Sequence, residues 1–462
     1  MSESHRIKSH LTRRHFLRRG LSVSAGALTV GATPLMGQFA RAQALNPDAP
    51  DRYYIFCYFG GGWDVLLALD PRDPRQFTSD MTSLQRTRIQ PGYEMLSLPD
   101  ADIHRTSDGR IFGPHLGELL RHTDRLAVVR GINMETVAHA GGRRRFLTGK
   151  PPSGVLARGS NGATWLASRL GGDDLIPNLS LRVESYNTDQ PNYATALRVD
   201  TVPDLLRALR PSDPRLFPTL RRQVDHTLRA ASLCPPSLQS RAWQKAEFAR
   251  ARSREIVSQG LGSLFDFGAR NPLMEELRGH YGFNQVNNSP GVAAALAAQA
   301  ITTGVSRCVT VNLVGGLDTH DGNSWSQQQG PRQQQGFDAV ARLMDDLANR
   351  PYDDRSSWLD HTIIVGFSEF SRTPLLNARG GRDHHITNSC FLAGGSVRGG
   401  QIIGASTNVA MQASPTNTHT GLPHPDGVIL KPEHILRSLY DEIGIDDRPD
   451  LRVRRLDTLL RT

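Results

Sequence analysis

Four short apolar runs, each followed by glycine or polar residues, constrain the fold of this chain more than any other feature. They span residues 52–59, 125–132, 307–314 and 361–367. Short apolar runs bounded by turn residues are typical of buried strands. The first run ends in "GGGWD" and the second leads toward "HAGGRRRFLTG", while the last two end in "GGLDTHD" and "SEFSRT".

Helical patterns lie between these runs. Residues 336–350 place apolar side chains at helical spacing, and residues 291–304 form another helix-like segment before a strand. Strands that alternate with helices predict an α/β fold, a doubly wound and mostly parallel sheet flanked by helices. Ligands of such sheets bind beyond the carboxyl ends of the strands, so the polar residues after each run are the candidate functional residues.

The N-terminal residues predict an export signal. Residues 12–20, "TRRHFLRRG", have the paired arginines, the Phe-Leu and the following basic residue of a twin-arginine signal, and "ARAQA" offers a cleavage site after Ala42. The apolar stretch between them is too short and too rich in Gly, Ser and Thr for a membrane span. We therefore expect residues 1–42 to be a signal peptide read by the twin-arginine translocase. The mature protein, residues 43–462, is expected to be periplasmic or secreted without a stable membrane span.

The formal net charge of +9 does not predict nucleic-acid binding. Residues 1–42 hold seven Arg or Lys and one acid, and so supply +6 of that charge. The mature chain is close to balanced, and we expect no nucleic-acid partner. Residues 193–281 are rich in Arg, Leu, Ala and Gln, with prolines between helical stretches, which predicts a helical insertion or cap in the mature domain.

Carboxylates and imidazoles gather after the strand-like runs. The candidates are Asp64, Asp318, His320, Glu369, Asp383 and His384. Such side chains at one sheet edge suit a divalent cation, because hard cations take oxygen ligands while zinc and manganese also accept imidazole nitrogen. The pattern predicts a divalent metal as cofactor: zinc, manganese or calcium. Each residue also has a structural explanation, such as a helix cap at Asp64.

A serine hydrolase is the less favoured reading of the same region. "GFSEF", residues 366–370, nearly matches G-x-S-x-G around Ser368. However, Phe370 stands where the final glycine belongs, and Pro374 cuts short a following helix. We therefore do not predict Ser368 as the nucleophile.

Four motifs carry a resemblance to a known family. "GGGWD", "GGLDTHD", "SEFSRTPLLNARGGRDHH" and "LAGGSVRGGQIIGAST" resemble, in order and spacing, the bacterial family called domain of unknown function 1501. That family looks like a remote member of the alkaline phosphatase and sulfatase superfamily, which implies a doubly wound sheet with one or two metals held at strand ends. Residue by residue, the resemblance implies two metal positions, one at Asp64 and Glu369, the other at Asp318, His320 and His384. Asp383 could instead orient His384.

The resemblance also assigns a role to residues 139–149, "HAGGRRRFLTG". Sulfatases resemble C-x-P-S-R-x-x-x-L-T-G, and related phosphatases place Thr or Ser where the Cys stands. Counting back from Gly149 puts His139 at that position and Arg143 at the sulfatase arginine. The motif implies that Arg143 and the helix N-terminus hold an anion. His139 could attack as a nucleophile, ligate a metal, or mark a site that has lost catalysis, with Thr136 as a reserve nucleophile.

We therefore expect an exported, metal-dependent hydrolase of phosphate or sulfate esters, acting on an anionic small molecule or polymer. His139 and Arg143 are the candidate catalytic residues. The alternative is a catalytically degenerate envelope protein that binds an anionic ligand or a protein partner. A full two-zinc centre is not expected, because Glu369-Phe370 stands where the superfamily often has Asp-His, and the Asp318 to His320 spacing is short.

Overall fold

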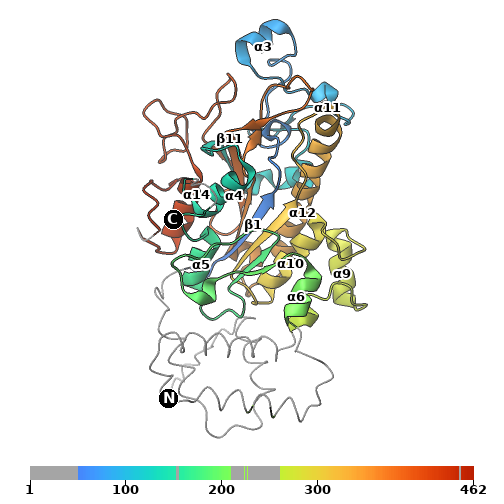
Figure 1. Cartoon of the computed structure of the whole chain (residues 1–462), viewed down its shortest axis with the longest axis vertical. Helices are drawn as coiled ribbons and strands as arrows, with labels where there is room; N and C mark the ends of the chain where they lie inside the picture. The colour runs from blue at the N-terminus through green and yellow to red at the C-terminus, as the bar shows by residue number, and fades with distance from the viewer. Residues whose placement is uncertain are drawn as a thin grey trace, which may run out of the picture.

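A computed structural model of the chain describes residues 50–151, 156–209, 223, 226, 261–446 and 449–461. An eight-stranded sheet forms its centre (Figure 1). From one edge to the other, its strands are β12 (Gln401–Ile403), β4 (Leu126–Asn133), β11 (Thr387–Ala393), β8 (Thr362–Phe367), β1 (Tyr53–Phe59), β7 (Cys308–Val314), β5 (Asn178–Leu181) and β6 (Leu197–Val199).

All strands of this sheet run in one direction except β11, which pairs antiparallel with β4 and with β8. The central strand β1 lies between β7 and β8, with Tyr54 opposite both Cys308 and Ile363. Parallel strands share one carboxyl edge, so the residues that follow β1, β4, β7 and β8 emerge on the same side. The predicted fold class, a doubly wound and mostly parallel α/β sheet flanked by helices, is confirmed.

The side chains of β1 alternate between two hydrophobic cores. Tyr53 and Ile55 belong to the core on one face of the sheet, and Tyr54 and Phe56 to the core on the other. Every residue of β1 is buried. A strand covered on both faces is apolar throughout, which explains why its sequence is a continuous apolar run.

Helices cover both faces of the sheet. On one face lie α9 (Pro272–Tyr281), α10 (Pro290–Thr302) and α12 (Gly330–Asn349), and on the other lie α4 (His139–Thr148), α5 (Gly162–Leu170) and α14 (Pro432–Glu442). Figure 1 shows the two groups on opposite sides of β1. The other α-helices of the described residues are α3 (Met81–Thr87), α6 (Val202–Leu209), α11 (Gly322–Ser324) and α13 (Trp358–His361).

Local sequence sets the ends of the helices that matter for the site. The side chain of Ser289 caps the N-terminus of α10, and Pro290 occupies its first turn. Helix α4 ends at Gly149, which adopts the left-handed conformation with φ of 65° that favours glycine. Residues 325–329 form a π-helix that leads into α12.

Two small hairpin-like sheets flank the central one. β2 (His104–Arg105) pairs with β3 (Ile111–Phe112), and β9 (Ser371–Arg372) pairs with β10 (His384–His385). Both pairings are antiparallel. The second small sheet joins the "SEFSRT" motif to the "GGRDHH" motif, because His384 pairs with Arg372.

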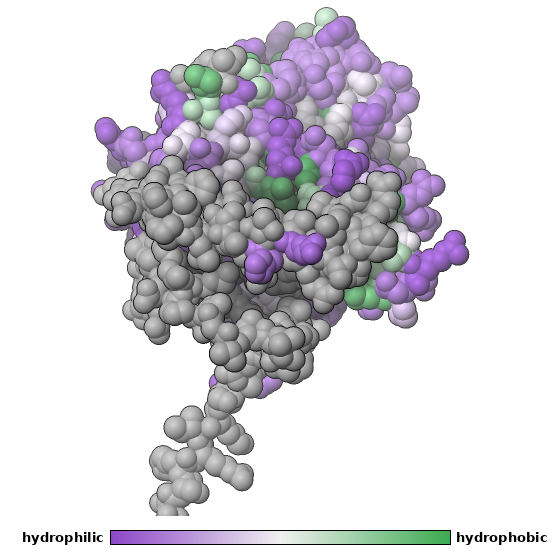
Figure 2. Space-filling model, turned by 60° about the horizontal axis from the view of Figure 1, so that its bottom comes forward, coloured by the Kyte–Doolittle hydropathy of each residue, from purple (hydrophilic) through white to green (hydrophobic). Residues whose placement is uncertain are grey.

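Parts of the predicted organisation fall outside the described residues. These are the predicted signal peptide, residues 1–42, and most of the predicted insertion. The described ends of residues 193–281 contain α6 and α9, and β6 among them belongs to the central sheet. No helix of the described segments is both long and apolar enough to cross a bilayer. The described surface visible in Figure 2 is mainly hydrophilic.

A buried ion cluster stabilises the loop after β1. Asp70 accepts a hydrogen bond from Arg72 at 2.8 Å and lies 3.6 Å from Arg130. Burial raises the pKa of Asp70, but these arginines and a hydrogen bond from Ser406 outweigh it and lower that pKa. The Asp70 carboxylate is therefore ionised and paired in the interior.

Candidate metal centre

Three segments at the carboxyl edge of the sheet meet around Asp318. Asp318 and His320 follow β7, and His384 lies in β10. Oδ1 of Asp318 is 2.9 Å from Nε2 of His320 and 3.0 Å from Nε2 of His384. The two Nε2 atoms are 3.1 Å apart. One carboxylate oxygen and two imidazole nitrogens thus form a nearly equilateral triangle.

A fourth donor lies beside the second carboxylate oxygen of Asp318. His139 is the first residue of α4, the helix that follows β4. Its Nε2 lies 3.3 Å from Oδ2 of Asp318. The candidate ligand atoms of His139, Asp318 and His384 all lie within 4.8 Å of one another. The Asp318 side chain is 45% exposed, so the cluster is open to solvent.

The second nitrogen of each imidazole is held by an acceptor. His139 Nδ1 lies 2.8 Å from Glu369 Oε1, and His320 Nδ1 lies 2.7 Å from Asp383 Oδ1. His384 Nδ1 lies 2.8 Å from the carbonyl oxygen of residue 137. Carbonyls and carboxylates can only accept, so all three Nδ1 atoms donate a proton. A ring in its neutral form then presents a bare Nε2 atom to the cluster, whereas a protonated ring presents an N–H group there.

Bare nitrogens and a carboxylate oxygen about 3 Å apart repel one another unless a cation lies among them. Protons can fill that role, and so can a metal ion. In a tetrahedral zinc site with bonds of about 2.0–2.1 Å, neighbouring ligand atoms are roughly 3.3 Å apart. The separations within the triangle, 2.9 to 3.1 Å, are slightly shorter than this spacing, and His139 Nε2 lies 3.3 Å from the second oxygen of Asp318. Three imidazoles and one carboxylate fit zinc or a similar transition metal better than calcium, which takes six to eight oxygens.

Glu369 orients His139 from beneath the cluster. The Glu369 side chain is only 1% exposed, and its Oε1 also accepts a hydrogen bond from the Gly61 amide at 2.9 Å. The hydrogen bond to Glu369 raises the pKa of His139, although burial opposes that shift. Burial likewise raises the pKa of Glu369, but the bond from His139 and neighbouring donors outweigh it and lower that pKa. Glu369 is therefore a carboxylate that fixes the tautomer of His139.

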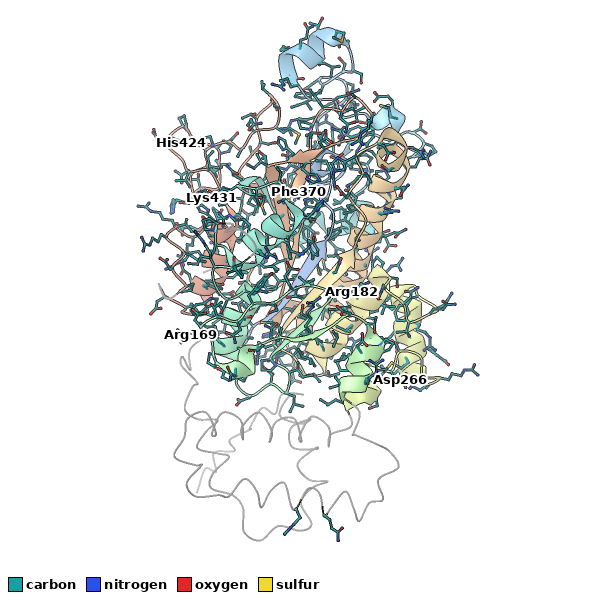
Figure 3. All side chains as sticks on the ribbon, in the orientation of Figure 1. Arg169, Arg182, Asp266, Phe370, His424 and Lys431 are labelled. Carbon is teal, nitrogen blue, oxygen red and sulfur yellow. The ribbon has the colours of Figure 1, made fainter. Side chains whose placement is uncertain are left out.

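Phe370 forms an apolar floor under two of the imidazoles. Its ring centroid lies 4.2 Å from that of His384 and 4.8 Å from that of His139. Phe370 is fully buried and is labelled above the middle of the view in Figure 3. Packing against this ring restricts the orientation of both imidazoles, in addition to their Nδ1 hydrogen bonds.

Three predicted site residues have other partners. Asp64 is fully buried, and its Oδ2 pairs with Arg382 at 3.0 Å and accepts a hydrogen bond from Trp325 at 2.8 Å. Asp64 and Glu369 thus have separate partners, Arg382 and His139, in place of the metal position that the resemblance implied for the two. Asp383 orients His320, whereas the resemblance suggested His384. His384 does not need Asp383, because its Nδ1 already lies beside the carbonyl oxygen of residue 137, in the segment between β4 and α4.

Arg143, predicted to hold an anion, is committed to a different interaction. Its Nε donates to the carboxylate of Glu184, and its Nη1 donates to the hydroxyl of Tyr58 at 3.3 Å. An ion pair neutralises the guanidinium, so Arg143 does not offer a free positive charge beside the cluster. Ser368, the alternative nucleophile, is fully buried and donates to the Phe59 carbonyl at 2.6 Å. That burial argues against a serine hydrolase.

Arg372 is a residue of this site that the sequence did not single out. Its Nη2 donates to Oδ1 of Asp318 at 2.7 Å. Burial raises the pKa of Asp318, but hydrogen bonds from Arg372 and His384 outweigh it and hold that pKa well below its ordinary value. In the sequence Arg372 stands three positions after Glu369 in "SEFSRT", whereas the carboxylate that it contacts in the structure is Asp318.

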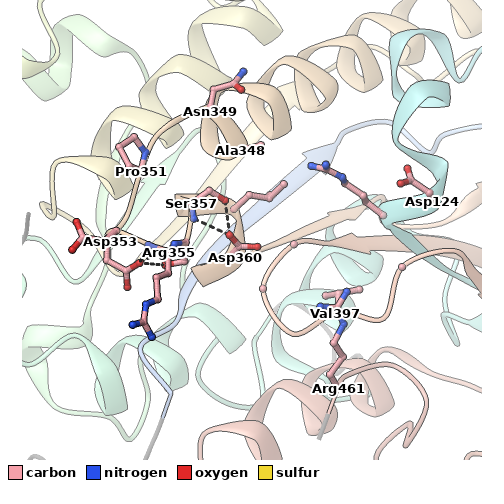
Figure 4. A pocket seen from close by; sticks show the side chains of 17 residues that line it. Asp124, Ala348, Asn349, Pro351, Asp353, Arg355, Ser357, Asp360, Val397 and Arg461 are labelled. Atoms are coloured by element: carbon pink, nitrogen blue, oxygen red, sulfur yellow. Dashed lines mark hydrogen bonds between the residues drawn. The ribbon is translucent and has the colours of Figure 1, made fainter. Parts of the chain in front are cut away.

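A separate cleft lies away from this cluster. It has a volume of about 750 Å³, lies at the amino edge of the sheet and is lined by residues that include Asp124, Asp360, Gly394 and Arg461 (Figure 4). One of its carboxylates, Asp360, already accepts hydrogen bonds from the Ser357 amide and hydroxyl at 2.8 and 2.7 Å. None of the predicted site residues lines this cleft.

Comparison with known proteins identifies a family for most of the chain. The family model "Protein of unknown function (DUF1501)" matches residues 51–421. No curated protein matches the chain.

Several solved structures resemble the chain at low identity. The crystal structure of Ps i-CgsB in complex with k-i-k-neocarrahexaose has a TM-score of 0.38 and 9% identity, covering 88% of this chain and 75% of that one. The crystal structure of Ps i-CgsB alone has a TM-score of 0.37 and 8% identity, with the same coverage of both chains. A third structure, described under the metabolism of multiple glycosaminoglycans by Bacteroides thetaiotaomicron, has a TM-score of 0.35 and 9% identity. The match covers 87% of this chain and 75% of that one.

Proposed function

Because the chain belongs to the DUF1501 family, whose function is unknown, we propose from its own geometry that it is an exported, metal-dependent hydrolase of phosphate or sulfate esters. The proposal applies to an anionic small molecule or a polymer that carries such esters. One observation carries it: three imidazole nitrogens, each fixed by an Nδ1 hydrogen bond, converge on the carboxylate of Asp318.

Each residue of the cluster has its own role in the proposed metal centre. Asp318, His320 and His384 would hold the cation, and His139 would complete the donor set or face the substrate. Glu369 would keep His139 in one tautomer. When bound, a divalent cation supplies a Lewis acid for the ester oxygen and lowers the pKa of water.

Helix α4 supports the anionic character of the proposed substrate. It begins at His139, so its first-turn amides lie beside the cluster. Helix N-termini favour anions because their first N–H groups lack partners within the helix. The amides of α4, rather than Arg143, are therefore the proposed contact for the charged group of the ester.

Metal analysis combined with a substrate panel tests this proposal. The purified protein should contain about one equivalent of zinc or a similar metal and should hydrolyse an aryl phosphate, a phosphodiester or an aryl sulfate. Asp318→Ala and His384→Ala should lose both metal and activity while remaining folded. His419→Ala is the matched control, because His419 also pairs with a carboxylate, Asp457 at 2.9 Å, but lies in another part of the chain.

The outcomes separate the two candidate functions. Turnover that disappears with the metal supports the hydrolase. Stoichiometric metal without turnover of any ester class would favour the alternative, an envelope protein that binds an anionic ligand or a partner. Absence of metal from protein expressed through its native export route contradicts the metal centre itself.

We also propose export by the twin-arginine pathway to the periplasm or beyond. The support is the paired Arg13 and Arg14 with the motif around them. Replacing both with lysine should leave the protein in the cytoplasm, whereas the native chain should appear in the periplasmic fraction. Equal export of the two forms would contradict this route.

A further inference from the structure

The guanidinium of Arg372 is buried at the junction of three loops. The Arg372 side chain is 0% exposed. Its Nε donates to the Gly62 carbonyl at 3.0 Å, and its Nη2 donates to the Leu317 carbonyl at 2.8 Å and also contacts the Gly61 carbonyl. Its Nη1 donates to the Arg382 carbonyl at 3.2 Å. These acceptors belong to the loops that follow β1 and β7 and precede β10.

The same guanidinium also holds a candidate metal ligand. Nη2 of Arg372 lies 2.7 Å from Oδ1 of Asp318, the oxygen that faces His320 and His384. Only an arginine offers donors in a rigid planar fork that can reach carbonyls and a carboxylate together. A lysine would keep the positive charge but could not make the same set of bonds.

Neighbouring residues of the same segment act on the imidazoles. Phe370, two positions earlier, packs against His139 and His384, and the Arg372 guanidinium lies 5.9 Å from the Phe370 ring. The Gly62 position is also close, since a β-carbon there would lie 2.5 Å from the Phe370 ring. The segment 369–372 therefore contacts both the carboxylate and the imidazoles of the cluster.

We propose that Arg372 is the positioning residue of the metal centre, which fixes the Asp318 oxygen that faces the imidazoles and joins the loop after β1 to the two segments that carry Asp318, His320 and His384. This inference rests on the proposed metal-dependent function. Arg372 itself is buried and does not reach substrate; it acts through Asp318. Ligating carboxylates commonly need such a hydrogen-bonded partner, and its loss typically costs 10–100-fold in metal affinity.

Cobalt titration of the mature chain tests the proposal. Arg372→Lys should bind Co²⁺ about 10–100-fold more weakly than the native protein, with a changed visible absorption spectrum, because the Asp318 oxygen is no longer held in place. Arg307→Lys is the matched control. Arg307 is equally buried and pairs with Asp174 at 3.0 Å, but it lies at the amino end of β7. Its variant should keep the native cobalt affinity and spectrum.

Each result supports or overturns the inference. A folded Arg372→Lys variant with native affinity and spectrum overturns the role of Arg372 while leaving the metal centre intact. Native protein that binds no cobalt overturns the proposed function and this inference with it.

If Arg372→Lys does not fold, a crystal structure of the zinc-loaded native protein decides. Arg372 Nη2 within hydrogen-bonding distance of a zinc-ligating Asp318 oxygen supports the inference. A guanidinium turned away from Asp318 refutes it.

Discussion

A single methyl group added at Gly142 should disturb the metal centre, although Gly142 is not one of its residues. Gly142 is a buried residue of α4, three residues after His139. A β-carbon added there would lie 2.2 Å from the carbonyl oxygen of Glu369 and 3.1 Å from its Cβ. The first obstacle is backbone, which cannot rotate away as a flexible side chain could. Helix α4 must therefore move away from the loop after β8.

The size of that movement sets the expected effect. Relieving the contact requires a displacement of about 1 Å to reach an ordinary carbon–oxygen separation. The hydrogen bond between His139 and Glu369 measures 2.8 Å, so such a displacement breaks it. Overpacking of this kind costs about 1–3 kcal/mol. In an unhindered helix the same change would stabilise by roughly 1 kcal/mol.

Urea unfolding and cobalt titration measure the consequence. We expect Gly142→Ala to lower the free energy of unfolding by about 1–3 kcal/mol and to weaken cobalt binding about 10–100-fold. Gly141→Ala is the control, because its β-carbon would meet side chains rather than backbone, the nearest being the Thr136 hydroxyl at 3.1 Å. It should be neutral or stabilising by up to about 1 kcal/mol. Equal unfolding free energies and equal cobalt affinities for Gly142→Ala and Gly141→Ala would show that the close approach of Gly142 to Glu369 does not control the metal centre.

Three further predictions concern the buried charges. Arg382→Met should lower the free energy of unfolding in urea by about 3–5 kcal/mol, because it leaves the carboxylate of Asp64 buried without its ion-pair partner; a change below about 1 kcal/mol would contradict this. The pKa of Asp70 is lowered on folding, so its contribution to stability is present above its unfolded pKa of about 3.9 and is lost as the pH falls through the folded value. Urea midpoints measured from pH 6 downward should fall less steeply in Asp70→Asn than in the native protein, and parallel curves would contradict the prediction. Glu369 raises the pKa of His139 above the ordinary histidine value of about 6.5, so protons compete with the metal for His139 at a higher pH than usual. In Glu369→Gln, the pH at which cobalt affinity is half lost should therefore be lower than in the native protein, and an unchanged midpoint would contradict this.

The sequence predicted the sheet and the edge where the site lies, because both depend on local patterns. The apolar runs became β1, β4, β7 and β8, and the polar residues after them emerge at one edge. Asp318, His320 and His384 were placed together by a family resemblance. In the structure Asp318 and His320 follow β7, and the pairing of β10 with β9, which comes shortly after β8, brings His384 to the same edge.

Individual partners could not be predicted, because they depend on side chains far away in the chain. Asp64 also follows a strand, but a buried guanidinium 318 positions later, Arg382, pairs with its carboxylate. Arg143 matches the sulfatase arginine in position, yet Glu184 neutralises it. A sequence gives the type of each charged group, but the pairing among several acids and bases is settled only when the loops pack.

The cluster draws its donors from positions as far apart as 139 and 384, and this separation bears on thermal stability. An unfolded chain holds these side chains tens of ångströms apart and offers no preformed site. A cation that binds the cluster therefore favours the folded state alone, by about 2.7 kcal/mol at a free concentration of 100 times Kd. The melting temperature of the protein would then report the metal supply of its surroundings.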